Sequence, residues 1–283
     1  MDTIAVSALQ LPLNRADEDE NIAAVAALVE DAAACGAKIV LPPELFAGPY
    51  FCAVEDEALF ALARPLGESP SVRAMQKLAK ALNVAIPTSF FERDGQHYYN
   101  TLAMIDAGGE VLGTYRKSHI PDGPGYEEKF YFRPGNSGFR VWDVCGTRIG
   151  VGVCWDQWFP EAARAMTLLG AELLFYPTAI GSEPYDPDFD TSRIWRRAML
   201  GHAASNCTPV ISANRIGAEH GTTFYGHSFI ADQWGDFLAD YGREETGALV
   251  ATLDLVAARR HRAGMGFFRD RRPELYRRLV EDV

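Results

Sequence analysis

The stretch Gly150–Glu161 constrains this chain more than any other. Arg148–Val153 is a short apolar run with two glycines, which predicts a buried strand. Phe159–Arg164 has a proline and a glutamate in its first turn, which is typical of a helix start. Cys154 therefore lies at a strand-to-helix elbow, which presents a side chain together with unpaired backbone N–H groups. Its thiol could attack a carbonyl or be a buried structural cysteine, and this stretch alone leaves both interpretations open.

The rest of the chain alternates between strand-like and helix-like segments. Ile4–Leu11 alternates in polarity as a strand does, a helix is predicted from a capping Asp17 to Gly36, and Lys38–Leu41 is a short buried strand. Further strands are predicted over residues 84–87, 98–105, 111–115, 139–144, 147–153, 173–176, 210–213, 228–231 and 249–255, and further helices over residues 72–82, 160–170 and 191–206. Residues 121–129 are too rich in Gly and Pro for regular structure. The pattern predicts an α/β fold, and because no repeat or linker interrupts the chain, we expect one domain over residues 1–283.

Composition bounds the kind of protein. The chain has 283 residues and a formal charge of −11, which argues against non-specific nucleic-acid binding and suits a cationic or neutral small ligand. Its five cysteines are spread out with no Cys-x-x-Cys pair, so neither a disulfide framework nor a zinc site is indicated, and a reducing compartment fits best. No leader sequence and no run of apolar residues long enough to cross a bilayer is found. We therefore expect a soluble cytoplasmic protein without a metal, a nucleic-acid partner or a membrane partner.

Glu44, Lys117 and Cys154 each follow directly on a strand-like run. If those strands are neighbours in one sheet, the three side chains meet at its edge. The carboxylate could then take the thiol proton, the thiolate could attack a carbonyl, and the ammonium could stabilise the oxyanion together with the backbone N–H of Trp155. Considered one at a time, the three residues are more simply explained as a loop glutamate, a surface lysine and a structural cysteine. His119 is best explained as a scaffold residue. Their joint placement favours acyl transfer.

The segments that carry these residues resemble the three signature segments of the nitrilase (carbon–nitrogen hydrolase) superfamily. They are Leu41–Leu45, Tyr115–His119 and Gly150–Asp156, in the family's order and at its approximate spacing. The similarity extends over nearly the whole chain. The resemblance implies an α-β-β-α sandwich that dimerises into a four-layer core, and it implies no metal and no cofactor.

The resemblance also implies roles for individual residues. Glu44 would be the general base, Lys117 the oxyanion stabiliser and Cys154 the nucleophile. Glu128 precedes a Lys-Phe-Tyr-Phe segment and fits a further family glutamate that orients the lysine and the attacking water. The arginine-rich tail from about residue 256 is too polar for a core, and we expect it at a subunit interface of a homo-oligomer built from dimers.

The loops His119–Tyr126 and Tyr176–Pro184 resemble those of one subfamily, the N-carbamoylputrescine amidohydrolases. That substrate carries a urea at one end and a protonated amine at the other, so its pocket needs an anion at the far end. Glu183 and Asp122 lie in these two loops, and Glu183 is our first hypothesis for the amine site. The expected substrate-binding residues are Trp155, Glu183, Asp122, Tyr50 and Ala179.

Several neighbouring activities also fit the sequence. Hydrolases of N-carbamoyl amino acids need arginine for the substrate carboxylate, and in relatives that act on carbamoyl-D-amino acids arginines lie shortly after the cysteine. Those places hold Gln157 and Trp158 here, although Arg193, Arg196 and Arg197 keep a carboxylate substrate open. These arginines are more simply explained by pairing with acids on helix faces or interfaces. The chain could also be a β-ureidopropionase, an ω-amidase, a nitrilase or a non-catalytic protein on the same fold.

Overall fold

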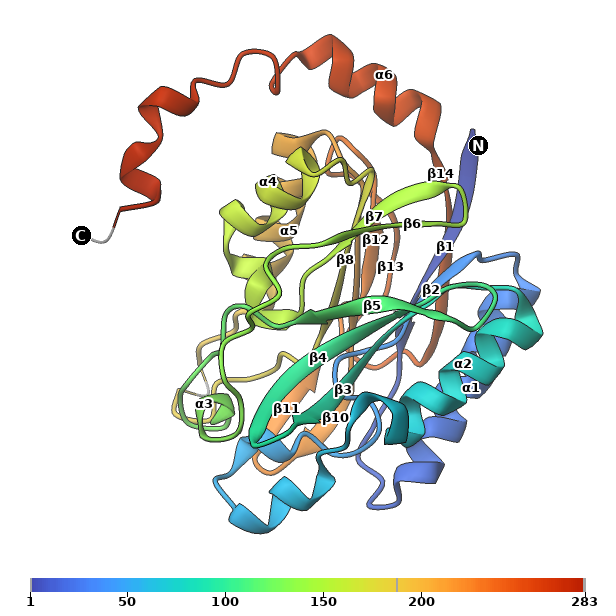
Figure 1. Ribbon diagram of the computed structural model, residues 1–283, viewed down its shortest axis with the longest axis vertical. Helices are drawn as coiled ribbons and strands as arrows, with labels where there is room; N and C mark the ends of the chain where they lie inside the picture. The colour runs from blue at the N-terminus through green and yellow to red at the C-terminus, as the bar shows by residue number, and fades with distance from the viewer. Residues whose placement is uncertain (1, 187, 282–283) are drawn as a thin grey trace.

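The computed structural model describes residues 2–186 and 188–281, and most of its strands form two sheets that face each other (Figure 1). The first sheet has the order β14-β1-β2, and a parallel bridge joins β2 to the start of the β3-β4-β5 meander. Backbone bonds from Val40 N to Ala85 O (2.9 Å) and from Ala85 N to Lys38 O (2.8 Å) make this join. The strands are β1 (Thr3–Gln10), β2 (Ile39–Leu41), β3 (Ile86–Asp94), β4 (His97–Ile105), β5 (Val111–Arg116) and β14 (Gly247–Asp254).

The second sheet has the order β13-β12-β9-β8-β7-β6, with β7, β8 and β9 parallel. Its strands are β6 (Val141–Val144), β7 (Thr147–Val151), β8 (Leu173–Thr178), β9 (Val210–Asn214), β12 (Phe229–Ala231) and β13 (Phe237–Asp240). A separate hairpin of β10 (Ile216–Glu219) and β11 (Thr222–Tyr225) projects from the end of β9. Parallel strands that connect through helices place their carboxyl ends together, which is where α/β proteins usually build sites.

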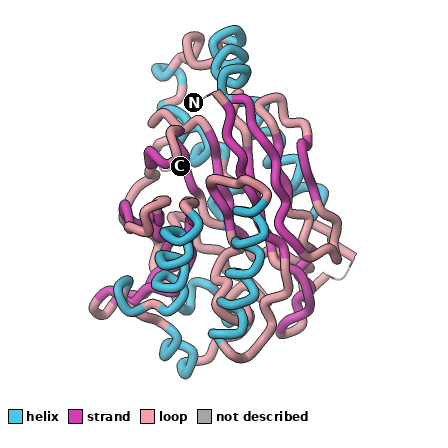
Figure 2. The backbone as a smooth tube through the Cα atoms, turned by 90° about the vertical axis from the view of Figure 1, so that its right-hand side faces the viewer, coloured by secondary structure: helices cyan, strands magenta, loops and turns pink. Residues whose placement is uncertain are grey.

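Helices cover the outer face of each sheet, which gives an α-β-β-α sandwich (Figure 2). Helices α1 (Glu18–Ala34) and α2 (Pro70–Leu82) pack on the first sheet, and α4 (Pro160–Leu168) and α5 (Ser192–Asn206) pack on the second. Two further helices are α3 (Glu128–Tyr131) and α6 (Leu255–Met265). Short 3₁₀ turns cover Phe51–Ala53, Glu57–Leu62, Leu66–Glu68, Cys154–Trp158, Pro273–Leu275 and Arg277–Leu279.

The alternation of side chains along each strand explains the layers. Ile39 lies in the apolar cluster between the sheets, whereas its neighbour Val40 lies in the outer cluster with α1 and α2. In the second sheet Phe175 belongs to the inner cluster and Leu174 to the outer cluster with α4 and α5. Because successive strand residues point to opposite faces, short runs that are apolar throughout are buried on both sides.

The helix ends follow from local chemistry. Asp17 caps α1 by accepting a bond from Asp19 N (2.8 Å), and Gly36, with φ of +91°, ends it by donating to Ala33 O. Ser69 caps α2 through Val72 N (3.4 Å). These caps confirm the predicted boundaries of both helices to within three residues.

Most predicted strands and helices are confirmed, and the departures have local reasons. Glu128 and Lys129 were expected in an irregular loop but begin α3, because Gly and Pro are confined to the earlier part of that loop. The short strands β10, β11 and β13 were not predicted. The predicted tail begins instead as helix α6, capped by Asp254, which accepts from Ala257 N (2.8 Å).

After α6 the chain leaves the sandwich as an arm that arches over one end of the molecule (Figure 1). Arg164 of α4 lies over the ring of Phe268 at 4.8 Å, which is one contact between this arm and the body. The expected domain 1–283 includes residues 1, 187, 282 and 283, which lie outside the described residues. Within the described part of the chain, none of the helices has the length and apolar character needed to span a bilayer.

Candidate active site

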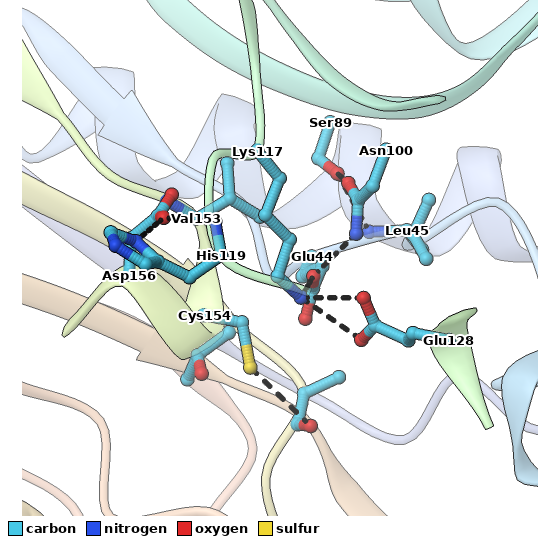
Figure 3. Close-up of polar contacts among 12 residues, drawn as sticks. Glu44, Leu45, Ser89, Asn100, Lys117, His119, Glu128, Val153, Cys154 and Asp156 are labelled. Carbon is cyan, nitrogen blue, oxygen red and sulfur yellow. Dashed lines mark hydrogen bonds and ion pairs between the residues drawn. The ribbon is translucent and has the colours of Figure 1, made fainter. Parts of the chain in front are cut away.

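Glu44, Lys117 and Cys154 meet where the ends of strands from both sheets come together (Figure 3). Glu44 follows β2 and Lys117 follows β5, both in the first sheet, whereas Cys154 follows β7 in the second. The expectation that one sheet edge carries all three is therefore wrong. Strand pairing depends on contacts between residues far apart in sequence, so a residue's position at a strand end does not reveal its sheet.

The Lys117 ammonium is enclosed by carboxylates. Its Nζ lies 2.9 Å from Glu44 Oε1 and 2.7 Å from Glu128 Oε2, and none of the three side chains has exposed surface. Burial alone lowers the pKa of Lys117, but Glu128 and Glu44 outweigh that effect and hold the pKa well above its usual value. Lys117 is therefore a fixed positive charge rather than a proton donor.

The two oxygens of Glu44 have different surroundings. Oε1 accepts from Lys117 Nζ and from Asn100 Nδ2 (2.7 Å). Oε2 is buried and has no hydrogen-bond partner among the described residues. A buried oxygen without a donor is costly unless it has a chemical use, and Oε2 is the oxygen free to take a proton.

Glu128, at the start of α3, holds the other side of Lys117. Its Oε1 also accepts from the Tyr50 hydroxyl at 2.7 Å. Burial raises the pKa of Glu128, Lys117 opposes that shift and Glu44 adds to it. Tyr50, predicted as a substrate-binding residue, is fully buried and instead orients Glu128 through this bond.

The elbow at Cys154 is held in a conformation that side chains other than glycine rarely adopt. The φ of Cys154 is +42°, a left-handed backbone that costs roughly 1–2 kcal/mol for such a residue. Buried Asp156 compensates, because its Oδ2 accepts from Val153 N (3.0 Å) and from the Tyr115 hydroxyl (2.7 Å). Its Oδ1 accepts from His119 N (3.0 Å) and pairs with His119 Nδ1 at 2.7 Å. His119 is thus a scaffold residue, as expected.

The surroundings of Cys154 favour its protonated thiol form. Burial raises its pKa far above the usual thiol value, Glu44 raises it further, and Lys117 only partly opposes them. A neutral thiol is a poor nucleophile, so it needs a base that removes its proton during attack. The negative charge of Glu44 that raises this pKa also marks Glu44 as the nearby acceptor.

A cavity of about 360 Å³ opens beside the thiol. Four predicted substrate-binding residues line it: Trp155, Ala179, Glu183 and Asp122. Cys154 and Glu128 also reach its wall, and Glu44 and Lys117 lie deeper. Its described lining residues include no Lys, Arg or His, so their formal charges are all negative.

The two positions at which relatives that act on carbamoyl-D-amino acids have arginines hold Gln157 and Trp158 in this chain. Trp158 lines the cavity, whereas Gln157 is buried and turned away from it. The Gln157 side chain donates to Thr178 Oγ1 (3.1 Å) and accepts from Trp195 Nε1 (2.7 Å). Arg196 pairs with Asp240 at 2.5 Å, as the helix-face explanation predicts. Gln157 and Trp158 therefore supply no cation to the cavity.

Comparisons with known proteins decide the family. The family model described as carbon-nitrogen hydrolase matches residues 5–263. The chain belongs to the carbon–nitrogen hydrolase family. The chain is 52% identical over 285 residues to an N-carbamoylputrescine amidase of Arabidopsis thaliana, a match that covers 98% of this chain and 95% of the relative. It is 50% identical over 284 residues to a citrullinase of Francisella tularensis subsp. tularensis, covering 99% of both.

A solved structure confirms the nitrilase-type α/β fold. The crystal structure of a carbon–nitrogen hydrolase from Helicobacter pylori G27 superposes with a TM-score of 0.93 at 35% identity, covering 99% of both chains. The predicted family and fold class are therefore confirmed for one chain. Within the described residues, no group of three or more His, Cys, Asp and Glu side chains is arranged to hold a metal ion.

Several residues that shape this carbon–nitrogen hydrolase site were missed from the sequence. Asp156 lies inside a signature segment, so its position next to the elbow could have suggested it. Asn100 carries no such signal, because it reaches the site from a distant part of the chain. Arg215 and Glu219, which hold the backbone beside Glu44, were also missed.

The protonated thiol gives a test of the base. In a Glu44→Gln variant we expect iodoacetamide to alkylate Cys154 near pH 7 at least about 100-fold more slowly, because the loss of the proton acceptor outweighs the lower thiol pKa that follows from removing the Glu44 charge. Mass spectrometry of the Cys154 peptide over time measures this rate. Exposed Cys35 in the same chain is the internal control and should react at an unchanged rate. An unchanged rate at Cys154 would show that Glu44 is not the acceptor.

Proposed function

We propose that this chain is a thiol hydrolase that converts N-carbamoylputrescine into putrescine, carbon dioxide and ammonia. The observation that carries the proposal is the cavity, which has Cys154 on its wall and carboxylates as its charged lining among the described residues. A substrate with a neutral urea and a cationic amine matches that arrangement. The full-length similarity to N-carbamoylputrescine amidases supports the same substrate.

The proposed first half-reaction forms a thioester. Glu44 takes the proton of Cys154 as sulfur attacks the urea carbon, and the oxygen gains charge beside Lys117 and the backbone N–H of Trp155. That N–H lies in the first turn of a 3₁₀ helix, where N–H groups have no partner within the helix. The C–N bond to the terminal NH₂ then breaks, Glu44 returns the proton, and ammonia leaves. An N-alkylcarbamoyl thioester remains on the sulfur.

The proposed second half-reaction regenerates the thiol. Glu44 takes a proton from water as the water oxygen attacks the thioester carbon, and the C–S bond breaks with return of the proton to sulfur. The released carbamate decays to carbon dioxide and putrescine. Glu128, fixed by Tyr50, keeps Lys117 in place through both steps and orients the water.

We place the substrate amine at Glu183, with Asp122 as the second choice. Glu183 lines the cavity and is partly buried, and burial raises its pKa. The aromatic rings of Tyr126, Tyr185 and Phe189 also line the cavity and suit an alkyl chain that ends in an ammonium group.

Citrulline is the second candidate substrate, because a citrullinase is among the most similar relatives. Citrulline carries the same urea but adds a carboxylate beside its amine. No described lining residue offers a positive side chain to that carboxylate, and the nearby carboxylates would repel it. The same reasoning disfavours β-ureidopropionase and carbamoyl amino acid substrates.

A substrate panel tests the proposal. We expect kcat/KM for ammonia release from N-carbamoylputrescine to exceed that from citrulline at least about 100-fold, since leaving a buried carboxylate unpaired costs about 3 kcal/mol. N-carbamoyl-β-alanine and glutaramate extend the panel to the β-ureidopropionase and ω-amidase reactions. Cys154→Ala should release no ammonia from any of these substrates. A higher kcat/KM on citrulline would refute the proposed substrate.

The amine site has its own test. Glu183→Gln should raise KM for N-carbamoylputrescine about 10- to 100-fold and change kcat little, because a charge-assisted bond is lost far from the urea. Only ionised Glu183 binds an ammonium, so wild-type KM should rise as pH falls through the raised pKa of Glu183, starting at a higher pH than for an exposed carboxyl. The variant should lack this rise. If Asp122→Asn has the effect instead, Asp122 holds the amine.

We also propose that two copies pair into a four-layer αββα-αββα core as a dimer that builds larger homo-oligomers, with residues of about 256–283 at the subunit interface. The arm carries exposed apolar side chains, including Phe267, Leu275 and Leu279, and Leu168 and Leu169 are exposed on α4 and its C-cap. Sedimentation should therefore give at least twice the chain mass of 31.2 kDa. Deleting residues 267–283 should lower that mass, and a monomeric full-length chain would contradict the proposal.

The proposed location is the reducing cytoplasm. All five cysteines are free thiols, including the exposed Cys35. Fractionation of cells that make the protein would test this location.

A further inference from the structure

A buried ion pair lies next to the site without lining the cavity. Arg215 follows β9 and Glu219 ends β10, and Nη1 of Arg215 lies 3.1 Å from Glu219 Oε2. The two side chains are 0% and 2% exposed. A buried pair of this kind seldom adds stability over apolar side chains of the same size, so its value to the protein lies in what the two charges hold.

Both charges bind the backbone of residues 44–50, called here the Glu44 loop. Arg215 Nη2 donates to the carbonyls of Glu44 (3.0 Å) and Leu45 (2.9 Å), and Nη1 donates to Gly48 O (3.2 Å). Glu219 Oε2 accepts from Tyr50 N at 2.6 Å. The pair therefore fixes both ends of the loop at once.

The two ends of the Glu44 loop carry groups that act on opposite sides of Lys117. At the first end Glu44 Oε1 lies 2.9 Å from Lys117 Nζ. At the other end the Tyr50 hydroxyl donates to Glu128, which holds Lys117 from its other side. The separation between the two carboxylates thus depends on the shape of this loop.

The Glu44 loop cannot keep that shape by itself. It contains no helix or strand, and Leu45 has φ of +47°, in the left-handed region that a leucine avoids. Ser89 Oγ accepts from Leu45 N (3.2 Å), and Arg215 binds the carbonyls of Glu44 and Leu45 (Figure 3 shows Leu45, Ser89 and Glu44). A strained residue next to a reacting group persists only where its surroundings hold it.

We propose that Arg215 and Glu219 are positioning residues that set the geometry of Glu44 and Glu128 around Lys117. The guanidinium fork is required, since its two terminal nitrogens serve three carbonyls and a carboxylate, whereas a lysine offers one point charge. The inference rests on the proposed function, because it assigns these residues to the same thiol hydrolysis. Their effect should appear in kcat, as base geometry governs chemistry and the amine end of the substrate lies elsewhere.

The test compares Arg215→Lys and Glu219→Gln with wild type on N-carbamoylputrescine. We expect kcat to fall at least about 10-fold in each and KM to stay within about threefold. Arg215→Lys keeps the charge and Glu219→Gln keeps the size, so both are the variants best suited to fold. Arg215→Met, which removes the charge, should lower kcat further.

Met199→Ala is the matched control. Met199 is fully buried on α5, in the outer cluster of the second sheet, which contains no residue of the Glu44 loop, so its truncation lowers stability away from that loop. Thermal denaturation identifies a temperature at which every variant is folded. When kcat is measured at that temperature, the control should keep the wild-type value.

Each outcome has a distinct meaning. If the Arg215 and Glu219 variants keep kcat, or lose only what an equally destabilised Met199→Ala loses, the pair is merely structural and the inference fails. A rise in KM with unchanged kcat also overturns it. If wild type releases no ammonia from N-carbamoylputrescine, the proposed function fails instead, and the same comparison on the substrate that is cleaved still tests the pair.

Discussion

The Lys117 ammonium, sealed between the Glu44 and Glu128 carboxylates, is the interaction on which the rest of this structure depends. Two negative charges and one positive charge share a space without exposed side-chain surface. Removing Lys117 would leave two buried carboxylates without a positive partner, and the loss of the partner of a buried charge typically costs about 3–5 kcal/mol. The fold must therefore hold all three groups in place, and much of the surrounding hydrogen bonding does so.

The excess negative charge also sets the chemistry of the sulfur. A thiol beside one ammonium alone would tend to ionise, but Glu44 raises the pKa of Cys154 and burial raises it more. Both effects favour the protonated thiol. This arrangement suits the proposed mechanism, in which Glu44 takes the thiol proton as sulfur attacks the carbonyl.

Two of the non-glycine residues with a left-handed backbone lie where the sheets deliver their groups. Leu45 and Cys154 both have left-handed backbones, and each is held by a buried charged side chain from elsewhere in the chain. Arg215 binds the carbonyls around Leu45, and Asp156 binds the N–H groups that flank the elbow. The pattern fits a site in which tight turns aim side chains into the gap between two layers.

Sequence alone determined the local elements and suggested which groups react. Apolar periodicity and caps such as Asp17 and Ser69 place α1 and α2, since these signals act over a few residues. The three signature segments indicate the family because each combines a strand end with a reactive side chain. Only the tertiary structure decided that Glu44 and Lys117 come from one sheet and Cys154 from the other. Only the tertiary structure revealed Asn100, Arg215 and Glu219 as residues that hold the site. Their hydrogen bonds join residues that no sequence spacing relates, and these contacts exist only once both sheets have packed.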